Sequence, residues 1–387
     1  MNKFNLKRKV IALSLGLAAM MLLATNLTAQ NGGGIFERGF VSDNVESNNR
    51  DGGIGLGGAQ SEDPTSPLGS GIAILTAIGA GYALLKRKQA ETMESTTVHV
   101  EELSKEQTRE RITALVMVFA VVIFFWMSFQ QAGLCLTYFA RDYTQSTATG
   151  FTRIGFNIWS LTLIAISVYT LFGIFQSETK RNKTICGIVT VLLWAGAIAL
   201  YLGMPDPINV LPQQFQQFNP FFVVALTPVS MAVFGALAKK GKEPSSPRKI
   251  GLGMIVAALG FLILVICSFP LASPAELKAQ GGVSSTLVSP NWLISTYFVL
   301  TFAELLLSPI GISFVTKVAP PKYKGMMMGL WFCVTAIGNY LTSVIARIWG
   351  TGMPLWMVWG VLVVLCLLSA VFIFSIMKRL ERATSGC

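Results

Sequence analysis

The sequence predicts an all-α protein, a polytopic bundle of transmembrane helices. The chain has 387 residues, of which 52% are hydrophobic and only 13% are charged. Apolar runs longer than about 18 residues recur along it, and each is long enough to cross a bilayer as a helix. A soluble core of this size does not need so much apolar surface. The lipid bilayer is therefore the first partner that we expect.

The first 88 residues are expected to form an exported segment on a membrane anchor. Residues 1–29 have a basic start, an apolar run and a small-residue cleavage site, as a signal peptide does, although an uncleaved anchor has the same features. Residues 30–66 are rich in Gly, Asn, Asp and Ser, which indicates a disordered exported stretch. Residues 67–88 hold an apolar run that ends in a basic cluster, so we expect a single transmembrane anchor with its C-terminal end in the cytoplasm.

The rest of the chain is expected to be a charged cytoplasmic linker, residues 89–112, followed by eight spans within residues 113–387. The apolar runs place these spans at roughly 113–139, 153–176, 184–203, 219–238, 250–270, 292–316, 326–349 and 355–377. Lys and Arg gather in alternate loops, and such loops face the cytoplasm. The pattern predicts a multi-pass protein of a bacterial-type cytoplasmic (inner) membrane, with its C-terminus in the cytoplasm.

Several function classes are disfavoured by composition. The net charge is +11, but no basic patch with interleaved aromatics lies outside the span flanks, so no nucleic-acid partner is expected. The single His99 lies in a polar segment without partners for catalysis. No CxxC pair occurs, and five of the six cysteines lie in apolar spans as small hydrophobic residues. We therefore expect no enzyme, no metal site and no cofactor.

Glu304 is the strongest candidate for a functional residue. It is the only acidic residue that we place within the hydrocarbon, where a charge costs about 2.5 to 3.5 kcal/mol on insertion scales. Thr301, Ser308 and Gly311 share its helix face by spacing, and Pro309 is expected to bend the helix. A carboxyl hydrogen-bonded between packed helices is the structural alternative, but intramembrane ionisable groups are more often functional.

Two other spans carry a narrow polar face. One has Trp331, Thr335, Gly338 and Thr342 at helical spacing, a pattern that also suits close helix packing. The first span has a stripe of Gln130, Gly133 and Thr137, with Gln131 beside it. Three helices with one polar face each suggest a shared cavity, in which these glutamines lie opposite Glu304.

Asn219 is the last candidate, in the segment LPQQFQQFNPFF before the fourth span. An Asn followed by Pro at a helix entry either caps free backbone amides or touches a substrate. The local sequence favours the capping role.

The chain from about residue 91 to its end resembles the C-terminal half of proton-dependent oligopeptide transporters (the POT, or PTR, family) of the major facilitator superfamily. The motifs that carry the resemblance occur in order and are FFWMSFQQAG, QQFNPFFVVALTP, EPSSPRKIGLGM, FAELLLSPIGISFVTKVAPPKYKGMMMGLWF and AIGNYL. They spread over about three quarters of the chain. The resemblance implies a C-terminal six-helix bundle like that of the major facilitators.

The resemblance also implies a function, proton-coupled uptake of di- and tripeptides by alternating access, with small peptides and protons as partners. Glu304 then corresponds to the acid that meets the peptide's amino terminus and takes part in proton coupling. Asn219 and Trp331 correspond to residues that line the peptide pocket. Thr335, Ser308, Gln130 and Gln131 are the further candidates for substrate binding or proton coupling.

Three departures separate the chain from the family pattern. The N-terminal bundle is missing, together with its ExxER motif, because Glu106, Glu110 and Arg111 have a different spacing. Two extra spans within residues 153–203 form an inserted two-helix hairpin. Gln130 stands where many relatives have an acid, and an amide cannot exchange protons.

Two function hypotheses follow. The first is a member of the peptide transporter family, truncated or inactive alone, whose transport would need either a separate N-terminal half or a homo-oligomer. The alternative is a membrane-anchored structural or interaction protein without transport activity, which displays residues 31–66.

Overall fold

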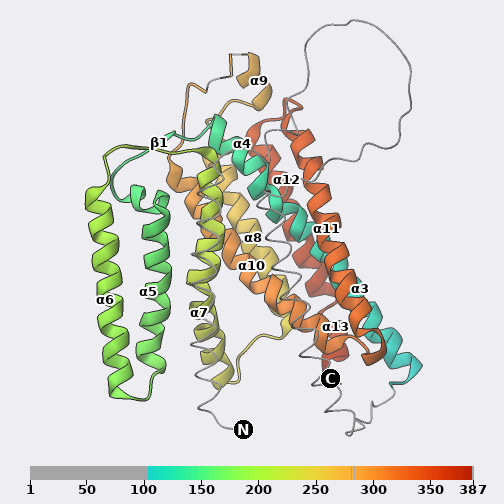
Figure 1. The fold of residues 1–387 in the computed structure, drawn as a ribbon. Helices are drawn as coiled ribbons and strands as arrows, with labels where there is room; N and C mark the ends of the chain where they lie inside the picture. Colours follow the sequence, from blue (N-terminus) through green and yellow to red (C-terminus); the bar gives the residue numbers. More distant parts are fainter. Residues whose placement is uncertain (1–102, 280, 283, 386–387) are drawn as a thin grey trace, which may run out of the picture. The chain divides into compact units, whose positions relative to one another are not determined.

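The computed structural model describes residues 103–279, 281–282 and 284–385. The expected signal peptide, exported segment, membrane anchor and most of the linker lie outside these residues. Eight helical segments in the described part are long and apolar enough to cross a membrane (Figure 1). Their main helices are α3 (Lys105–Phe129), α5 (Ile158–Gln176), α6 (Lys180–Gly203), α7 (Phe218–Lys239), α8 (Ser246–Ser268), α10 (Pro290–Val318), α11 (Lys324–Trp349) and α12 (Leu355–Ser375).

Shorter elements connect these helices. They are the helices α4 (Cys135–Asp142), α9 (Pro274–Ala279) and α13 (Met377–Ser385), the 3-10 segments η1 (Gln130–Gly133), η2 (Gly150–Phe156), η3 (Pro212–Gln217) and η4 (Pro321–Tyr323), and the two-residue strands β1 (Thr147–Ala148) and β2 (Ile208–Asn209). The strands pair antiparallel and are the only sheet in the described residues. The predicted all-α polytopic fold is confirmed.

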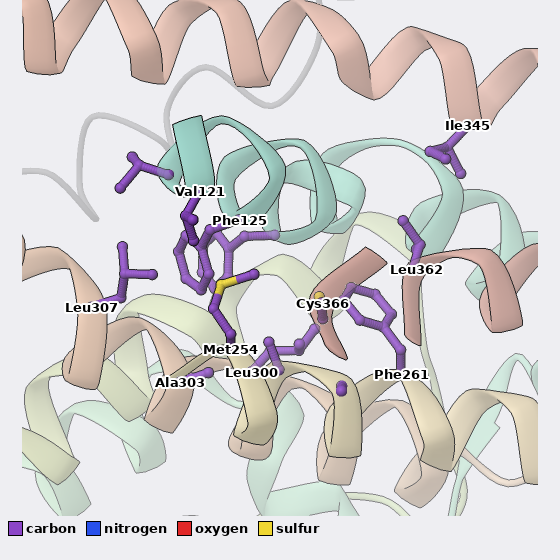
Figure 2. Packing of buried hydrophobic residues seen from close by; sticks show 14 of the residues in the cluster. Val121, Phe125, Met254, Phe261, Leu300, Ala303, Leu307, Ile345, Leu362 and Cys366 are labelled. Carbon is purple, nitrogen blue, oxygen red and sulfur yellow. The ribbon is translucent and has the colours of Figure 1, made fainter. Parts of the chain in front are cut away.

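The core of the bundle is built around α8, which packs on α10 and on α12. Two glycines of α8 allow the approach to α10, since a Cβ on Gly253 would lie 3.1 Å from the Ala303 carbonyl oxygen, and one on Gly260 would lie 2.9 Å from the Leu300 side chain. Small residues permit such backbone contact in membranes, where dispersion forces drive helix association. Figure 2 shows Phe125 of α3 beside Met254 of α8 in this core.

Helices α5 and α6 form the inserted hairpin that the sequence predicts. They pack on each other, and α5 also packs on α7, as Figure 1 shows in green. The hydroxyls of Thr170 and Thr190 lie 2.7 Å apart across the pair. Most residues of α6 are exposed, and they include large apolar side chains.

Arg153 fixes the two ends of this hairpin to each other. Its side chain is buried and donates to the carbonyl oxygens of Gly150 (3.0 Å), Met204 (2.9 Å) and Pro205 (2.7 Å). It also pairs with Asp206 at 3.3 Å and lies over the Tyr201 ring. One guanidinium therefore satisfies carbonyls from both ends of the hairpin.

The first span differs from the uninterrupted helix that hydropathy predicts. Its α-helical hydrogen bonding stops at Phe129, the backbone passes through η1 and an irregular Leu134, and α4 then resumes. The carbonyl of Ala132 in this break accepts hydrogen bonds from Thr137 (3.1 Å) and Tyr297 (3.2 Å). Side chains thus satisfy backbone groups that the interruption frees, as a membrane requires.

The two ends of the spans differ in charge. The connections α5–α6, α7–α8 and α10–α11, together with α13, lie at the end where α3 begins, and they carry clusters of Lys and Arg. The strands and α9 lie at the opposite end (Figure 1). The helices therefore keep the alternation of basic loops that the sequence indicates.

Candidate functional site

Three polar side chains meet where α7 packs on α10, and we call them the α7–α10 polar group. The Nδ2 of Asn219 donates to the Oε2 of Glu304 at 2.9 Å and to the Oγ1 of Thr301 at 3.2 Å. Thr301 is fully buried, while Asn219 and Glu304 are half-buried. Both amide hydrogens of Asn219 are thus used to hold one face of α10.

Glu304 keeps one carboxylate oxygen uncommitted. Its Oε2 accepts from Asn219, but its Oε1 takes no hydrogen bond from any described residue. No ion pair compensates Glu304 within the described residues either. Two events can offset the free-energy cost of burying this charge. The carboxylate can take up a proton, or it can pair with a cation.

Asn219 is held in place by its aromatic neighbours. Phe218 is buried and its ring lies 5.4 Å from that of Phe156 and 5.9 Å from that of Phe222. The Phe222 ring in turn makes an edge contact with Phe298 of α10 at 5.2 Å. This aromatic cluster fixes the first turns of α7 against α10, and thereby fixes the position of the Asn219 amide.

The capping role that the local sequence favours for Asn219 is wrong. Helix α7 continues from η3, its N-cap position is Gln217, and no side chain caps it. Asn219 lies in the first turn of the helix and its amide points across to α10. Pro220 is tolerated beside it, because the first-turn amides of a helix have no partner within that helix.

Trp331 belongs to α11, is buried in the bundle, and packs on α10 further along that helix than Glu304. Its ring packs on Gly311, where a Cβ would lie only 2.2 Å from the ring, and it makes an edge contact with Phe119 at 6.2 Å. Gly311 is seven residues beyond Glu304, or about 10 Å along a helix. Ser308 lies between them and is half-buried. The Thr335 hydroxyl donates to the Trp331 carbonyl at 3.0 Å, within its own helix.

Gln131 does not share the α7–α10 polar group. It is buried, and its Nε2 donates to the carbonyl oxygens of Met127 (3.0 Å) and Thr342 (3.4 Å), which joins α3 to α11. Gly338 also serves the packing of α11 on α3, since a Cβ there would lie 2.7 Å from the Ile123 carbonyl oxygen. Gln130 is half-buried in η1. The structure therefore gives the Gln131 amide a packing partner in place of the expected position opposite Glu304.

Tyr297 lies on the same face of α10 as Glu304, and it was not among the predicted site residues. Its hydroxyl bonds to the break in the first span, and the side chain is buried. The signal was present, because Tyr297, Thr301, Glu304, Ser308 and Gly311 follow one another at steps of four and three residues. One face of α10 thus contacts η1, α7 and α11 in turn.

Comparison with known proteins gives matches over part of the chain. A family model described as the POT family matches residues 188–354. The peptide transporter YePEPT of Yersinia enterocolitica is 38% identical over 131 residues, which is 34% of this chain and 24% of that protein. Dipeptide and tripeptide permease B of Salmonella typhimurium is 30% identical over 210 residues, or 48% of this chain and 41% of that protein.

A further relative and one solved structure also match part of the chain. Dipeptide and tripeptide permease B of Xenorhabdus bovienii is 28% identical over 209 residues, which is 50% of this chain and 41% of that protein. A crystal structure of a POT family transporter in complex with 5-aminolevulinic acid aligns with a TM-score of 0.49 at 16% identity, over 83% of this chain and 56% of that one. The chain spans less than half the length of these curated relatives.

Proposed function

We propose that this chain, whose residues 188–354 match the POT family model, takes part in proton-coupled uptake of small peptides across a bacterial-type inner membrane. The relatives named as peptide transporters and permeases support the substrate class. The basic loops at one end of the spans support an orientation with the C-terminus in the cytoplasm.

The observation that carries the proposal is the half-buried carboxylate of Glu304, held by Asn219 and lacking a cation among the described residues. Such a group suits a peptide's ammonium, which would pair with Oε1 while Asn219 stays on Oε2. It also suits a proton, since protonation removes the same buried charge. A proton and a peptide ammonium are thus two ways to neutralise the same carboxylate, so the charge state of Glu304 depends on both.

The remaining candidates receive supporting roles in this proposal. Ser308 of α10, and Trp331 of α11 where it packs on Gly311 of α10, would line the path of the peptide's side chains. Thr335 would position Trp331 through its backbone. Gln130 and Gln131 would act at the break of the first span, where a change in the α3–α11 contact would reach the face of α10 through Tyr297.

The test is uptake of a radiolabelled dipeptide into proteoliposomes under an imposed inward proton gradient. Glu304→Gln keeps the size of the side chain and removes its exchangeable charge, so we expect uptake to fall to background. The matched control is Asp142→Asn, which changes a carboxylate that pairs with Arg141 at the end of α4. Gradient-driven uptake by Glu304→Gln at the rate of the control would refute the assignment of Glu304.

We also propose that the chain works with a second bundle, supplied either by another copy or by a separate polypeptide. The matched region covers at most 41% of the curated relatives described above, and α6 and α7 are largely exposed. One bundle alone leaves half of an alternating-access cavity unlined. The mass of the particle in lipid nanodiscs tests this, and a particle that is monomeric while transport-competent would contradict it.

The same reconstitution distinguishes transport from the alternative of a membrane-anchored interaction protein. That alternative predicts no uptake, with or without a companion bundle, and no binding of a labelled dipeptide to the purified protein. Dipeptide binding that is weakened by Glu304→Gln, and unchanged by Asp142→Asn, would exclude it even where the reconstituted chain does not transport.

A further inference from the structure

A cavity of about 780 Å³ lies between the first turns of α3 and the C-terminal helix α13, at the basic end of the spans. Its charged lining residues come from these two helices and are Glu106, Arg109, Glu110, Lys378, Arg379 and Arg382. It is therefore separate from the α7–α10 polar group. Ligand sites in proteins commonly have volumes of about 300 to 1,000 Å³, so this cavity has room for the headgroup of a lipid.

The charge of the lining favours an anion. Four cationic side chains outnumber the two carboxylates. Among the described residues, Arg109, Lys378 and Arg379 form no ion pair of 4 Å or less with a carboxylate. Thr113 and Ser375 add hydroxyl groups to the same lining. Guanidinium groups match phosphate oxygens well, because their planar donors bind two oxygens at once.

Helix α13 is fixed so that its basic side chains stay at this cavity. Met377, Leu380 and Ala383 are buried against the bundle, while Lys378 and Arg379 are exposed. Glu381 accepts from the Ser245 hydroxyl at 2.7 Å and pairs with Arg248 at 2.8 Å, which ties α13 to the start of α8. An amphipathic helix that directly follows a span lies at the level of the lipid headgroups.

We propose that this cavity binds the phosphate of an anionic glycerophospholipid, with Arg109 and Arg379 as the main ligands from its two walls. The carboxylates of Glu106 and Glu110 accept hydrogen bonds from headgroup hydroxyls, as in a glycerol headgroup. The basic loops place this end in the cytoplasmic leaflet, whose anionic lipids attract such clusters. The site anchors the first span and the C-terminal helix to one lipid, and it does not depend on peptide transport.

The experiment is native mass spectrometry of the full chain in detergent, titrated with phosphatidylglycerol or with phosphatidylcholine. The test variant is the double change Arg109→Gln and Arg379→Gln. The control is Arg181→Gln with Lys183→Gln, which removes two exposed cations at the same end of the spans. We expect the wild type and the control to bind phosphatidylglycerol more tightly than phosphatidylcholine. The test variant should bind phosphatidylglycerol roughly 30-fold more weakly, since each cation near the surface contributes a factor of about 5.

The proposal is overturned if the test variant and the control bind phosphatidylglycerol equally, or if the wild type does not distinguish the two lipids. Competition with inorganic phosphate at millimolar concentration distinguishes a lipid phosphate from a soluble phosphate as the bound anion. Displacement of phosphatidylglycerol by inorganic phosphate would identify a soluble anion as the occupant and reject the lipid. If the double variant does not fold, Arg379→Gln alone should weaken binding about fivefold, and unchanged binding would contradict the proposal.

Discussion

At the scale of single residues, Asn219 decides how Glu304 is presented. Its one amide nitrogen contacts both Glu304 and Thr301, so the carboxylate has a fixed orientation with one oxygen occupied. This contact joins residues 85 positions apart in the chain. The sequence marked each of them as polar within or beside a span, but no local pattern reveals the partner of a side chain at such a separation. The capping interpretation failed for that reason.

Asn219→Ala should weaken peptide uptake by about tenfold or more, because a hydrogen bond to a charged group contributes about 1.5 to 3 kcal/mol. The loss is expected in the KM for a labelled dipeptide, measured in proteoliposomes. Asn182→Ala is the matched control, since Asn182 is an exposed amide near the start of α6. Equal KM values for the two variants would show that the Asn219 contact is dispensable.

At the scale of elements, the positions of the helices follow from the sequence more closely than their internal breaks. Hydropathy locates the spans because bilayer thickness sets the length of an apolar run. It does not register the change from α-helix to 3-10 helix at Gln130, because average hydropathy depends on composition and not on backbone conformation. The glutamines mark the place, but their roles depend on which helix lies opposite, and for Gln131 that helix is α11.

The seam between α3 and α11 gives an element-scale prediction. A Cβ on Gly338 would lie 2.7 Å from the Ile123 carbonyl oxygen and 2.7 Å from the Trp126 Cβ. Gly338→Ala must therefore separate the helices and strain the Gln131–Thr342 contact, at a cost of about 1 to 3 kcal/mol. Thermal unfolding in detergent should show a lower melting temperature than for Gly329→Ala, whose added Cβ meets nothing within 4 Å on the same helix. Equal melting temperatures would contradict this tight seam.

At the scale of the whole molecule, one face of α10 connects the parts that transport would need to coordinate. Tyr297 bonds to the break in the first span, Glu304 to the start of α7, and Gly311 receives the Trp331 ring of α11. A proton or peptide at Glu304 would therefore act at the centre of this face. We expect a change of charge there to alter the packing of neighbouring helices, because each of them contacts α10 directly.

The most direct test of coupling at Glu304 is proton entry triggered by peptide. Proteoliposomes that hold the protein with its companion bundle and a pH-sensitive dye inside are mixed with a dipeptide, in the absence of an imposed gradient. The wild type should acidify the lumen as the dipeptide enters, whereas Glu304→Gln should give no acidification and Asp142→Asn should behave as the wild type does. Dipeptide-triggered acidification by Glu304→Gln at the wild-type rate would contradict the role of this carboxylate.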